Sequence, residues 1–247
     1  MDYSEQLPPR SLAAIVKVAW SLSVPPGSAE VVHSALPDGC IEIIARECGS
    51  SHWLRPQPSR FVVGLIDRPA ELRFGGGSRF AGLRLWPWAW TWLSGSPLNL
   101  RNDWQDAADS ALGDNQRQVL AQPSAGSWEP LQTLFRHCVD PLDHRFAQAA
   151  LATDQTAAMA QQLSVSTRSC QRWFVRNAGI TPRSFRRLRR FEQGLRALEG
   201  SAASLAEHAQ LAGYADQAHM AREFRRYAKA PAQGLRGHMR GPFLAKT

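Results

Sequence analysis

Side chains able to bond the edges of DNA bases recur at helical spacing in two short segments, residues 160–174 and 209–224. These side chains are Arg168, Gln171 and Arg172 in the first segment and Gln217, His219 and Arg222 in the second. Arginine can form a pair of hydrogen bonds with guanine O6 and N7, and glutamine can do the same with adenine N6 and N7. The residue types therefore predict hydrogen-bonded reading of a DNA sequence.

Each segment has the pattern of a helix-turn-helix unit, whose second helix enters the major groove of DNA. In the first unit, Cys170, Trp173 and Phe174 fall three and four residues apart and predict the buried side of that helix. The base-reading side chains, together with Thr167, fall off that side. Ser166 is expected to cap the helix, and the exposed terminus that it forms can also contact a phosphate.

The second unit offers fewer polar groups to DNA. Met220, Phe224 and Tyr227 are expected to point inward, and two of the outward positions are Ala218 and Ala221. Alanine can touch a thymine methyl group but forms no hydrogen bond with a base. The first unit is therefore predicted to carry more of the discrimination between sequences.

A long arginine-rich helix is predicted between the two units. Thr181 and Pro182 are typical of a helix start, because threonine caps a helix and proline suits its first turn, and the helix extends to about Glu199. Some of its arginines are expected to contact phosphates, and at least one to pair with an acidic neighbour. The phosphate candidates are Arg183, Arg186 and Arg187 of this helix and Arg225 of the second unit. A rigid helix would hold the two recognition helices about one DNA turn apart, roughly 34–36 Å.

The positive charge of the chain is concentrated around these motifs. The 247 residues carry a net charge of +8. Residues 151–247 contain 16 Lys and Arg against 6 Asp and Glu, whereas residues 1–150 contain 13 against 15. Such an excess fits the neutralisation of phosphates, although a solubilising surface explains the charge alone equally well.

The first part of the chain has the pattern of β-structure. Apolar and β-branched runs are separated by turn signals such as Pro37-Asp38-Gly39, in which proline presets φ and glycine accepts a positive φ. The predicted strands are residues 31–36, 40–44, 60–66, 70–74 and 79–85. The predicted helices of this part are residues 87–93, 104–112, 114–121 and 128–139. We therefore predict an α+β chain, with a β-rich domain and flanking helices over residues 1–143 and an all-α domain over residues 144–247.

Residues 156–236 resemble the DNA-binding domain of AraC-family transcriptional regulators. The landmarks that carry the resemblance are Ser166, Gln171-Arg172, Phe174, Gly179-Ile180-Thr181-Pro182, Arg190, Gly213-Tyr214, Asp216-Gln217, Arg222, Phe224-Arg225, Pro231 and Leu235-Arg236. The resemblance implies two helix-turn-helix subdomains joined by a long helix, with double-stranded DNA and RNA polymerase as partners. Four residues depart from the family pattern, namely Phe191, Gly194, His208 in place of a buried aliphatic residue, and Ala228 in place of a helix-ending glycine.

The first part of the chain resembles the amino-terminal domain of a less characterised subset of the same family. The resemblance rests on Pro8-Pro9, Leu12, Trp20 and the Leu-Pro-Asp-Gly-Cys motif at residues 36–40, which Ile41 and Glu42 follow. It implies a β-rich domain that forms a homodimer or binds a small-molecule effector. The identity of the effector does not transfer with the resemblance.

Four tryptophans at alternate positions of residues 86–92 allow two interpretations. One is an aromatic cluster that faces the core or a second subunit. The other is an effector pocket, because such pockets are mostly apolar with a few polar groups. Asp38 could instead serve only as a turn residue that bonds its own backbone. The candidate effector-binding residues are Asp38, Glu42, Arg84, Trp86 and Trp88.

The sequence has no pattern for a cofactor, a metal site or catalysis. Its histidines are scattered, and Gly75-Gly76-Gly77 lacks the lysine and helix of a phosphate-binding loop. The competing class is a DNA-tethered enzyme such as a methyl-transfer repair protein, which needs a cysteine cluster for zinc and an acceptor thiol. Cys40 and Cys48 are a poor substitute for that cluster. We therefore expect a non-catalytic transcription regulator, and a first domain that only dimerises remains a further alternative.

The ends and apolar runs of the chain favour a protein of the bacterial cytoplasm, associated with the nucleoid. No basic segment followed by an apolar stretch begins the chain, and no apolar run approaches the roughly 20 residues of a membrane helix. Four cysteines without paired spacing fit reduced thiols.

Overall fold

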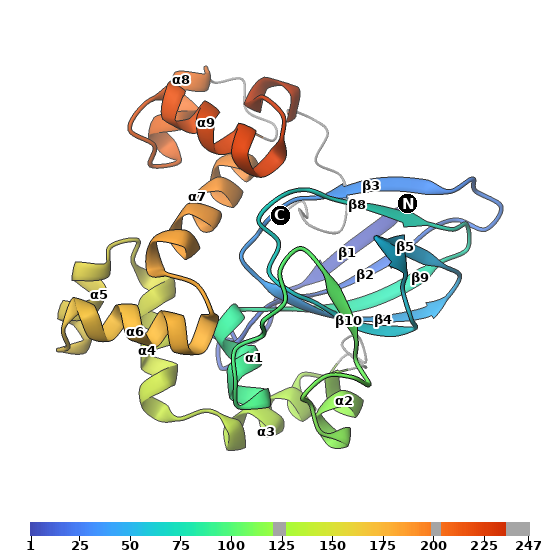
Figure 1. Ribbon diagram of the computed structural model, residues 1–247, viewed down its shortest axis with the longest axis horizontal. Coiled ribbons are helices and arrows are strands. Elements are labelled where there is room, and N and C mark those ends of the chain that lie inside the picture. Colours follow the sequence, from blue (N-terminus) through green and yellow to red (C-terminus); the bar gives the residue numbers. More distant parts are fainter. Residues whose placement is uncertain (121–126, 199–203, 236–247) are drawn as a thin grey trace.

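The computed structural model of the chain describes residues 1–120, 127–198 and 204–235. It contains a domain of two β-sheets followed by a helical part, in which α7 (Pro182–Leu198) leads away from α6 (Thr167–Ala178) to the last two helices (Figure 1). The predicted α+β class is confirmed.

The larger sheet has six strands in the order β1-β2-β9-β4-β7-β10, and every neighbouring pair is antiparallel. The strands are β1 (Asp2–Gln6), β2 (Val16–Ser23), β9 (Arg79–Leu85), β4 (Ile41–Cys48), β7 (Arg60–Val63) and β10 (Trp104–Asp106). One face of this sheet packs on the smaller sheet and the other on helices, so both faces of its central strands are buried. Burial on both faces explains why β4 and β9 are rich in apolar residues without regular alternation.

The smaller sheet has four strands in the order β3-β8-β5-β6. These are β3 (Val31–Ala35), β8 (Ala70–Phe74), β5 (Ser51–Trp53) and β6 (Arg55–Pro56). Ala70, Leu72 and Phe74 of β8 are buried, and the residues between them are exposed. This alternation places one apolar face against the larger sheet and leaves the other in solvent.

The predicted strands are all present, but one predicted helix is wrong. Residues 104–112, predicted as a helix, begin with strand β10, which pairs with β7 through Trp104 and Val63. Tertiary contacts decide this outcome, because the indole of Trp104 is buried, donates a hydrogen bond to the Trp53 carbonyl at 2.8 Å, and stacks under Arg55. The sequence prediction also missed β1, β2, β5 and β6.

The other predicted helices are present with bounds close to those expected. They include α1 (Pro87–Ser94), α2 (Asp114–Leu120) and α3 (Glu129–Cys138) in the first part and the two helix-turn-helix units in the second. The remaining helices are α4 (Pro141–Ala152), α5 (Thr156–Leu163), α8 (Leu205–Leu211), α9 (Gln217–Ala228) and the short 3-10 helix η1 (Ala232–Leu235). The sequence analysis also placed helix ends at Ala121 and Glu199 and a family landmark at Arg236. These three residues lie outside the described part of the chain.

The turn at Pro37-Asp38-Gly39 has the predicted chemistry and carries the chain from the smaller sheet to the larger. Gly39 has φ +75°, and the Asp38 carboxylate accepts a hydrogen bond from the Cys40 backbone N–H at 2.9 Å. The strands on either side therefore do not form a hairpin, since β3 and β4 belong to different sheets.

One apolar core runs from the larger sheet through α1 to the first helix-turn-helix unit. It includes Leu85 of β9, Trp88 of α1, Phe174 of α6 and Phe185 of α7. The second unit packs instead on the far half of α7, in a separate cluster. The two sheets and helices α1–α3 are together called the β domain. The β domain therefore holds the first unit directly and the second unit mainly through α7.

Gly82 of β9 lies where a side chain would collide with the core. A Cβ at this position would stand 2.3 Å from Trp20 Cε2, and Trp20 is itself buried. We expect Gly82→Ala to lower the free energy of unfolding by about 1–3 kcal/mol through overpacking. Chemical denaturation would measure the change.

Gly113→Ala is the matched control, because the nearest atom to its added Cβ is the end of the flexible Gln116 side chain at 3.7 Å. This variant is expected to stay within about 0.5 kcal/mol of the parent. Equal stabilities of the two variants would contradict the packing at Gly82.

Candidate nucleic-acid interface

The first helix-turn-helix unit consists of α5 and α6, which meet at a tight turn. Ser164 has φ +57° after α5, and Ser166 caps α6 by accepting a hydrogen bond from the Ser169 N–H at 3.1 Å. Cys170 and Trp173 face the core, as their spacing predicts. The turn and the cap together fix the direction in which α6 leaves the turn.

The predicted base-reading side chains of α6 lie together on its solvent face. Thr167, Arg168, Gln171 and Arg172 are all exposed, and so is the cap residue Ser166. Within the described part of the chain, the side chains of Arg168, Gln171 and Arg172 form no hydrogen bond or ion pair. Their donors are therefore available to a ligand without breaking an internal contact.

The second unit, α8 and α9, is built with a stronger set of caps. Ser204 and Glu207 form a reciprocal capping box at the start of α8. The Asp216 carboxylate caps α9 by accepting a hydrogen bond from the His219 N–H at 2.6 Å. The outward positions Gln217, Ala218, Arg222 and Arg225 are exposed.

His219 is less available than its exposed neighbours. It is half-buried, and its ring stands edge-on to Tyr214 with the ring centroids 5.3 Å apart. Its Nδ1 also accepts a weak hydrogen bond from the Ala215 N–H at 3.4 Å. Nε2 of His219 forms no hydrogen bond within the described residues, so it is the ring nitrogen that His219 can offer to a base.

The four departures from the family pattern have structural counterparts in the packing of the second unit on α7. His208 is buried, and its two ring nitrogens lie 2.8 Å from the carbonyl oxygens of Ser204 and Ala197, so it links α8 to the end of α7. Phe191 packs edge-on against Phe224, with the ring centroids 5.1 Å apart.

The other two departures, Gly194 and Ala228, affect how closely α7 approaches the second unit and where α9 ends. A Cβ on Gly194 would stand 3.3 Å from Tyr214 and 3.4 Å from Phe224, so the glycine allows α7 to approach this unit closely. After Ala228, Lys229 takes the left-handed conformation with φ +56°. The residue that ends α9 with a positive φ is therefore one position later than Ala228.

The phosphate candidates are not equally free. Arg183 and Arg225 are exposed, whereas Arg186 is half-buried and donates to the Thr156 hydroxyl. Arg187 forms a bidentate ion pair with the buried carboxylate of Glu223, with its Nε 3.1 Å from both carboxylate oxygens. This pair ties α7 to α9 and matches the expectation that at least one arginine of the helix pairs with an acidic neighbour.

Three residues of the effector hypothesis meet in one buried cluster of charges. The Nε of Arg84 lies 2.7 Å from Glu42 Oε1 and 3.0 Å from Asp38 Oδ2, and its Nη1 lies 3.2 Å from Glu5 Oε1. Glu42 and Arg84 face each other across β4 and β9. The cluster also includes Lys17, whose Nζ lies 3.6 Å from Asp38 Oδ2.

The ionisation of this cluster follows from its burial and its excess of carboxylates. Burial raises the pKa of Glu42 to about 7, against the lowering effect of Arg84. Burial also opposes ionisation of Asp38, but Lys17 and Arg84 hold its pKa below the ordinary value. Between about pH 4.5 and about pH 7, Glu42 therefore keeps its proton while Asp38 stays charged.

Trp86 and Trp88, the aromatic members of the effector hypothesis, lie in the core between the two parts of the chain. Their indole N–H groups donate to the carbonyls of Ala13 and Ala14 at 3.0 and 2.7 Å. Both rings pack on Phe185 of α7. This arrangement corresponds to the core-facing interpretation of the tryptophans.

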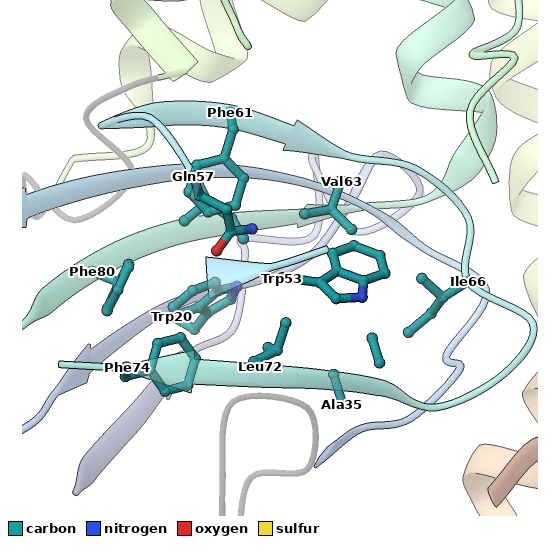
Figure 2. Close-up of a pocket in the computed structure, with 12 residues that line it drawn as sticks. Trp20, Ala35, Trp53, Gln57, Phe61, Val63, Ile66, Leu72, Phe74 and Phe80 are labelled. Carbon is teal, nitrogen blue, oxygen red and sulfur yellow. The ribbon is translucent and has the colours of Figure 1, made fainter. Parts of the chain in front are cut away.

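Two hollows lie elsewhere in the described residues, and the sequence pointed to neither. A cavity of about 30 Å³ lies between the two sheets, where side chains from both sheets converge (Figure 2). It is lined by Trp20, Ala35, Ile44, Trp53, Gln57, Phe61, Val63, Ile66, Ala70, Leu72, Phe74 and Phe80. This volume has room for about one or two water molecules. The signal that could have indicated it was one aromatic residue in each of several strands, among them Trp20, Trp53 and Phe61.

A larger hollow of about 440 Å³ lies between the chain before β2, α3 and the start of α4. It is lined by Ser11, Leu12, Ile15, Gln132, Phe135, Arg136, Val139, Pro141 and His144. Burial lowers the pKa of His144. No spacing in the sequence connects these three segments, so only the fold could bring them together.

Two family models match this chain, each over one of its parts. Residues 159–237 match the model described as a helix-turn-helix domain. Residues 4–105 match the model described as a domain of unknown function (DUF6597). Comparison with curated proteins finds no match.

Several solved structures are similar in outline to this chain. ToxT from Vibrio cholerae is 9% identical with a TM-score of 0.45, over 95% of this chain and 98% of that one. ToxT bound to (E)-4-(8-methylnaphthalen-1-yl)but-3-enoic acid is 10% identical with a TM-score of 0.44, over the same shares. The transcriptional regulator CdpR from Pseudomonas aeruginosa is 17% identical with a TM-score of 0.34, over 65% of this chain and 46% of that one. Likenesses at this level carry no argument about function.

The resemblance to AraC-family regulators drawn from the sequence is confirmed for the carboxyl-terminal part, which carries an AraC-type helix-turn-helix domain. The matches do not single out the Leu-Pro-Asp-Gly-Cys motif. The helix-turn-helix match supports a DNA-binding transcription regulator. No helix among the described residues is long and apolar enough to cross a membrane.

The raised pKa of Glu42 predicts a pH dependence of stability with a defined sign. The unfolded chain releases this proton near pH 4.3, whereas the folded protein keeps it up to about pH 7. The contribution of Glu42 to stability therefore falls as the pH rises from about 4.5 to about 7. The free energy of unfolding of Glu42→Gln minus that of the parent should therefore increase as the pH rises from about 4.5 to about 7. Above pH 7 this difference in unfolding free energy should stay constant.

Urea denaturation at a series of pH values would measure the difference. Glu47→Gln, at the exposed end of the same strand, is the matched control. A Glu42→Gln difference that is constant from pH 4.5 to 7 would show that this carboxyl does not hold the proton.

Proposed function

We propose that the protein regulates transcription without catalysis, by reading two adjacent major-groove segments with α6 and α9. The observation that carries this proposal is the pair of recognition helices with exposed polar faces, both attached to α7. The proposed base-reading residues are Arg168, Gln171 and Arg172 of α6 and Gln217, His219 and Arg222 of α9, with Ser166 and Thr167 at the helix start.

The phosphate contacts are proposed to set the register of the protein on DNA. Arg183 and Arg225 can make them without rearrangement because both are exposed. Arg186 and Arg187 can do so only if they leave Thr156 and Glu223. RNA polymerase and a second copy of the chain are further proposed partners, and the nucleoid is the proposed place of action.

The competing enzymatic function has an observation against it. Methyl transfer needs an activated acceptor thiol, which is favoured by a lowered pKa. Cys40 is buried, and burial together with Asp38 raises the pKa of its thiol well above the ordinary value. Among the described residues, no group of three or more His, Cys, Asp and Glu side chains could hold a metal ion.

The first domain is proposed to respond to a small-molecule effector. The hollow of about 440 Å³ beside α3 falls in the range of roughly 300–1,000 Å³ that is typical of ligand sites, whereas the cavity between the sheets does not. The buried Leu12 and Phe135 line it, and so does the exposed Arg136, which has no ion pair to any described residue. These features suit a ligand with an apolar body and one acidic group.

The effector candidates taken from the sequence serve a different role in this proposal. Asp38, Glu42 and Arg84 are engaged with one another, and Trp86 and Trp88 fill the core. They would sense an effector only through a shift of the β domain. The alternative of a domain that dimerises without a ligand is separated by the screen described next.

A thermal-shift screen of aromatic and aliphatic carboxylates on the full chain is expected to find compounds that raise the melting temperature. Arg136→Gln should lower the affinity for such acids by about tenfold, the loss expected for one charge-assisted hydrogen bond. Arg10→Gln, an exposed arginine that does not line the hollow, is the control. A screen without hits, together with a stable dimer in sedimentation equilibrium, would favour the dimerisation alternative.

Selection of oligonucleotides by the full chain at moderate salt tests the DNA-reading proposal. We expect a preferred operator with two short conserved segments. Arg172→Ala should then cost about 1–3 kcal/mol on that operator and little on random DNA. Arg10→Ala should leave both affinities unchanged. Equal losses on both DNAs would make Arg172 a phosphate contact, and a selection without any preferred sequence would contradict the proposal.

A further inference from the structure

The Leu-Pro-Asp-Gly-Cys motif packs against α7. All five of its residues are buried. A Cβ on Gly39 would stand 3.5 Å from the Leu188 Cβ and 3.8 Å from the Phe185 ring. Leu36 belongs to the same apolar cluster as Leu188. Residues 36–40 therefore form a seat for α7 on the β domain.

Next to this seat, a buried ion pair joins the β domain to α7. The Lys17 Nζ of β2 lies 2.7 Å from Glu192 Oε1 of α7, and the two side chains are 11% and 8% exposed. Glu192 lies one helical turn beyond Leu188, and therefore on the same side of α7. The ion pair thus continues the apolar contact of the seat along one side of the helix.

The ion pair is also connected to the interior of the β domain. Lys17 lies near Asp38 of the seat, and Asp38 contacts Arg84, which bonds Glu42 of the neighbouring strand. A continuous chain of charged contacts therefore runs from the larger sheet to α7. A displacement of the sheet that moved Arg84 would change the surroundings of Glu192.

The first recognition helix is fixed to the same domain by other contacts. The Thr91 hydroxyl of α1 donates to the Asn177 carbonyl of α6 at 2.6 Å. Arg101 donates to the Gly179 carbonyl, just after α6, at 3.1 Å. Trp88 of α1 packs on Trp173, with the ring centroids 5.5 Å apart. The β domain therefore contacts α6 at one place and α7 at another.

A body that holds both α6 and α7 fixes the angle between them. Because α9 is attached to α7 through Arg187 and Glu223 and through the packing of Phe191 on Phe224, this angle also sets the separation of the two recognition helices. The separation decides which spacing of two operator segments the protein can read.

We infer that the β domain holds the two recognition helices at a fixed separation. In this arrangement residues 36–40 seat α7, and the ion pair Lys17–Glu192 is the positioning contact that sets where α7 lies on the β domain. This inference rests on the proposed reading of two groove segments. An ion pair suits the role because its strength depends on geometry, whereas apolar contact tolerates sliding. Glu192 and Lys17 are thus positioning residues, which influence DNA recognition without touching DNA.

The test measures spacing preference with the full chain. Operators obtained by selection are rebuilt with one or two base pairs inserted into or removed from the interval between the two segments. The parent protein is expected to bind the selected spacing much more tightly than the altered spacings. Glu192→Gln should reduce this discrimination by about fivefold or more, as expected for loss of a coupling contact.

The double variant Lys17→Met/Glu192→Gln guards against a trivial loss of folding, because it removes both charges of the buried pair. Their other partners stay compensated, since Asp38 keeps its contact with Arg84 and Arg196, which also pairs with Glu192, is partly exposed. It should keep a cooperative melting transition and show the same reduced discrimination. Gln193→Ala, an exposed neighbour of Glu192 on α7, should retain the parent preference. A double variant that folds and keeps the parent spacing preference would overturn the inference.

Hydrogen exchange in the absence of DNA provides a second readout. Amides of α7 near Phe185–Glu192 and of residues 36–40 should exchange faster in Glu192→Gln than in Gln193→Ala, since the seat opens more often. Unchanged exchange would also count against this role of the β domain. Failure of the parent to select any two-segment operator would contradict the proposed function instead, so the two failures are distinguishable.

Discussion

The packing of the first helix-turn-helix unit and α7 around Trp88 is the contact on which the arrangement of the molecule depends. Trp88 is fully buried, its N–H is bonded to the Ala14 carbonyl, and its ring meets Trp173, Phe174 and Phe185. Loss of a buried tryptophan typically costs about 3–5 kcal/mol, a large share of the stability of an ordinary domain. The aromatic contact is therefore a large contribution to the packing between the two parts of the chain.

The charged contacts at the same interface have a different physical role. A buried ion pair gains little net free energy because desolvation offsets the attraction of the charges, but it is sensitive to geometry. Apolar packing already holds the β domain and α7 together. Lys17–Glu192 and the cluster around Arg84 thus help to fix the orientation of α7 relative to the β domain. An interface of this kind can be stable and still respond to a small change in the β domain.

The arginines of the second part illustrate how structure divides one residue type among several tasks. Arg187 and Arg189 are used internally, on Glu223 and on the carbonyls at the end of α4, whereas Arg168 and Arg172 remain open to solvent. A charge count cannot separate these groups, because each arginine contributes equally to it. The positive charge that is exposed to solvent therefore comes from a subset of these arginines.

The sequence by itself determined the parts whose signals are local. The cap Ser166, the apolar spacing of α6 and α9 and the turn at Gly39 depend on residues a few positions apart, and each appears in the structure as expected. Tertiary structure alone decided the parts that depend on distant partners. Trp104 joins a strand because β7 offers an unpaired edge and Trp53 a carbonyl, and Lys17 meets Glu192 only because the fold brings together segments far apart in the chain. Pairing between distant segments leaves no periodic trace in the sequence, since each partner satisfies its local pattern equally well in other surroundings.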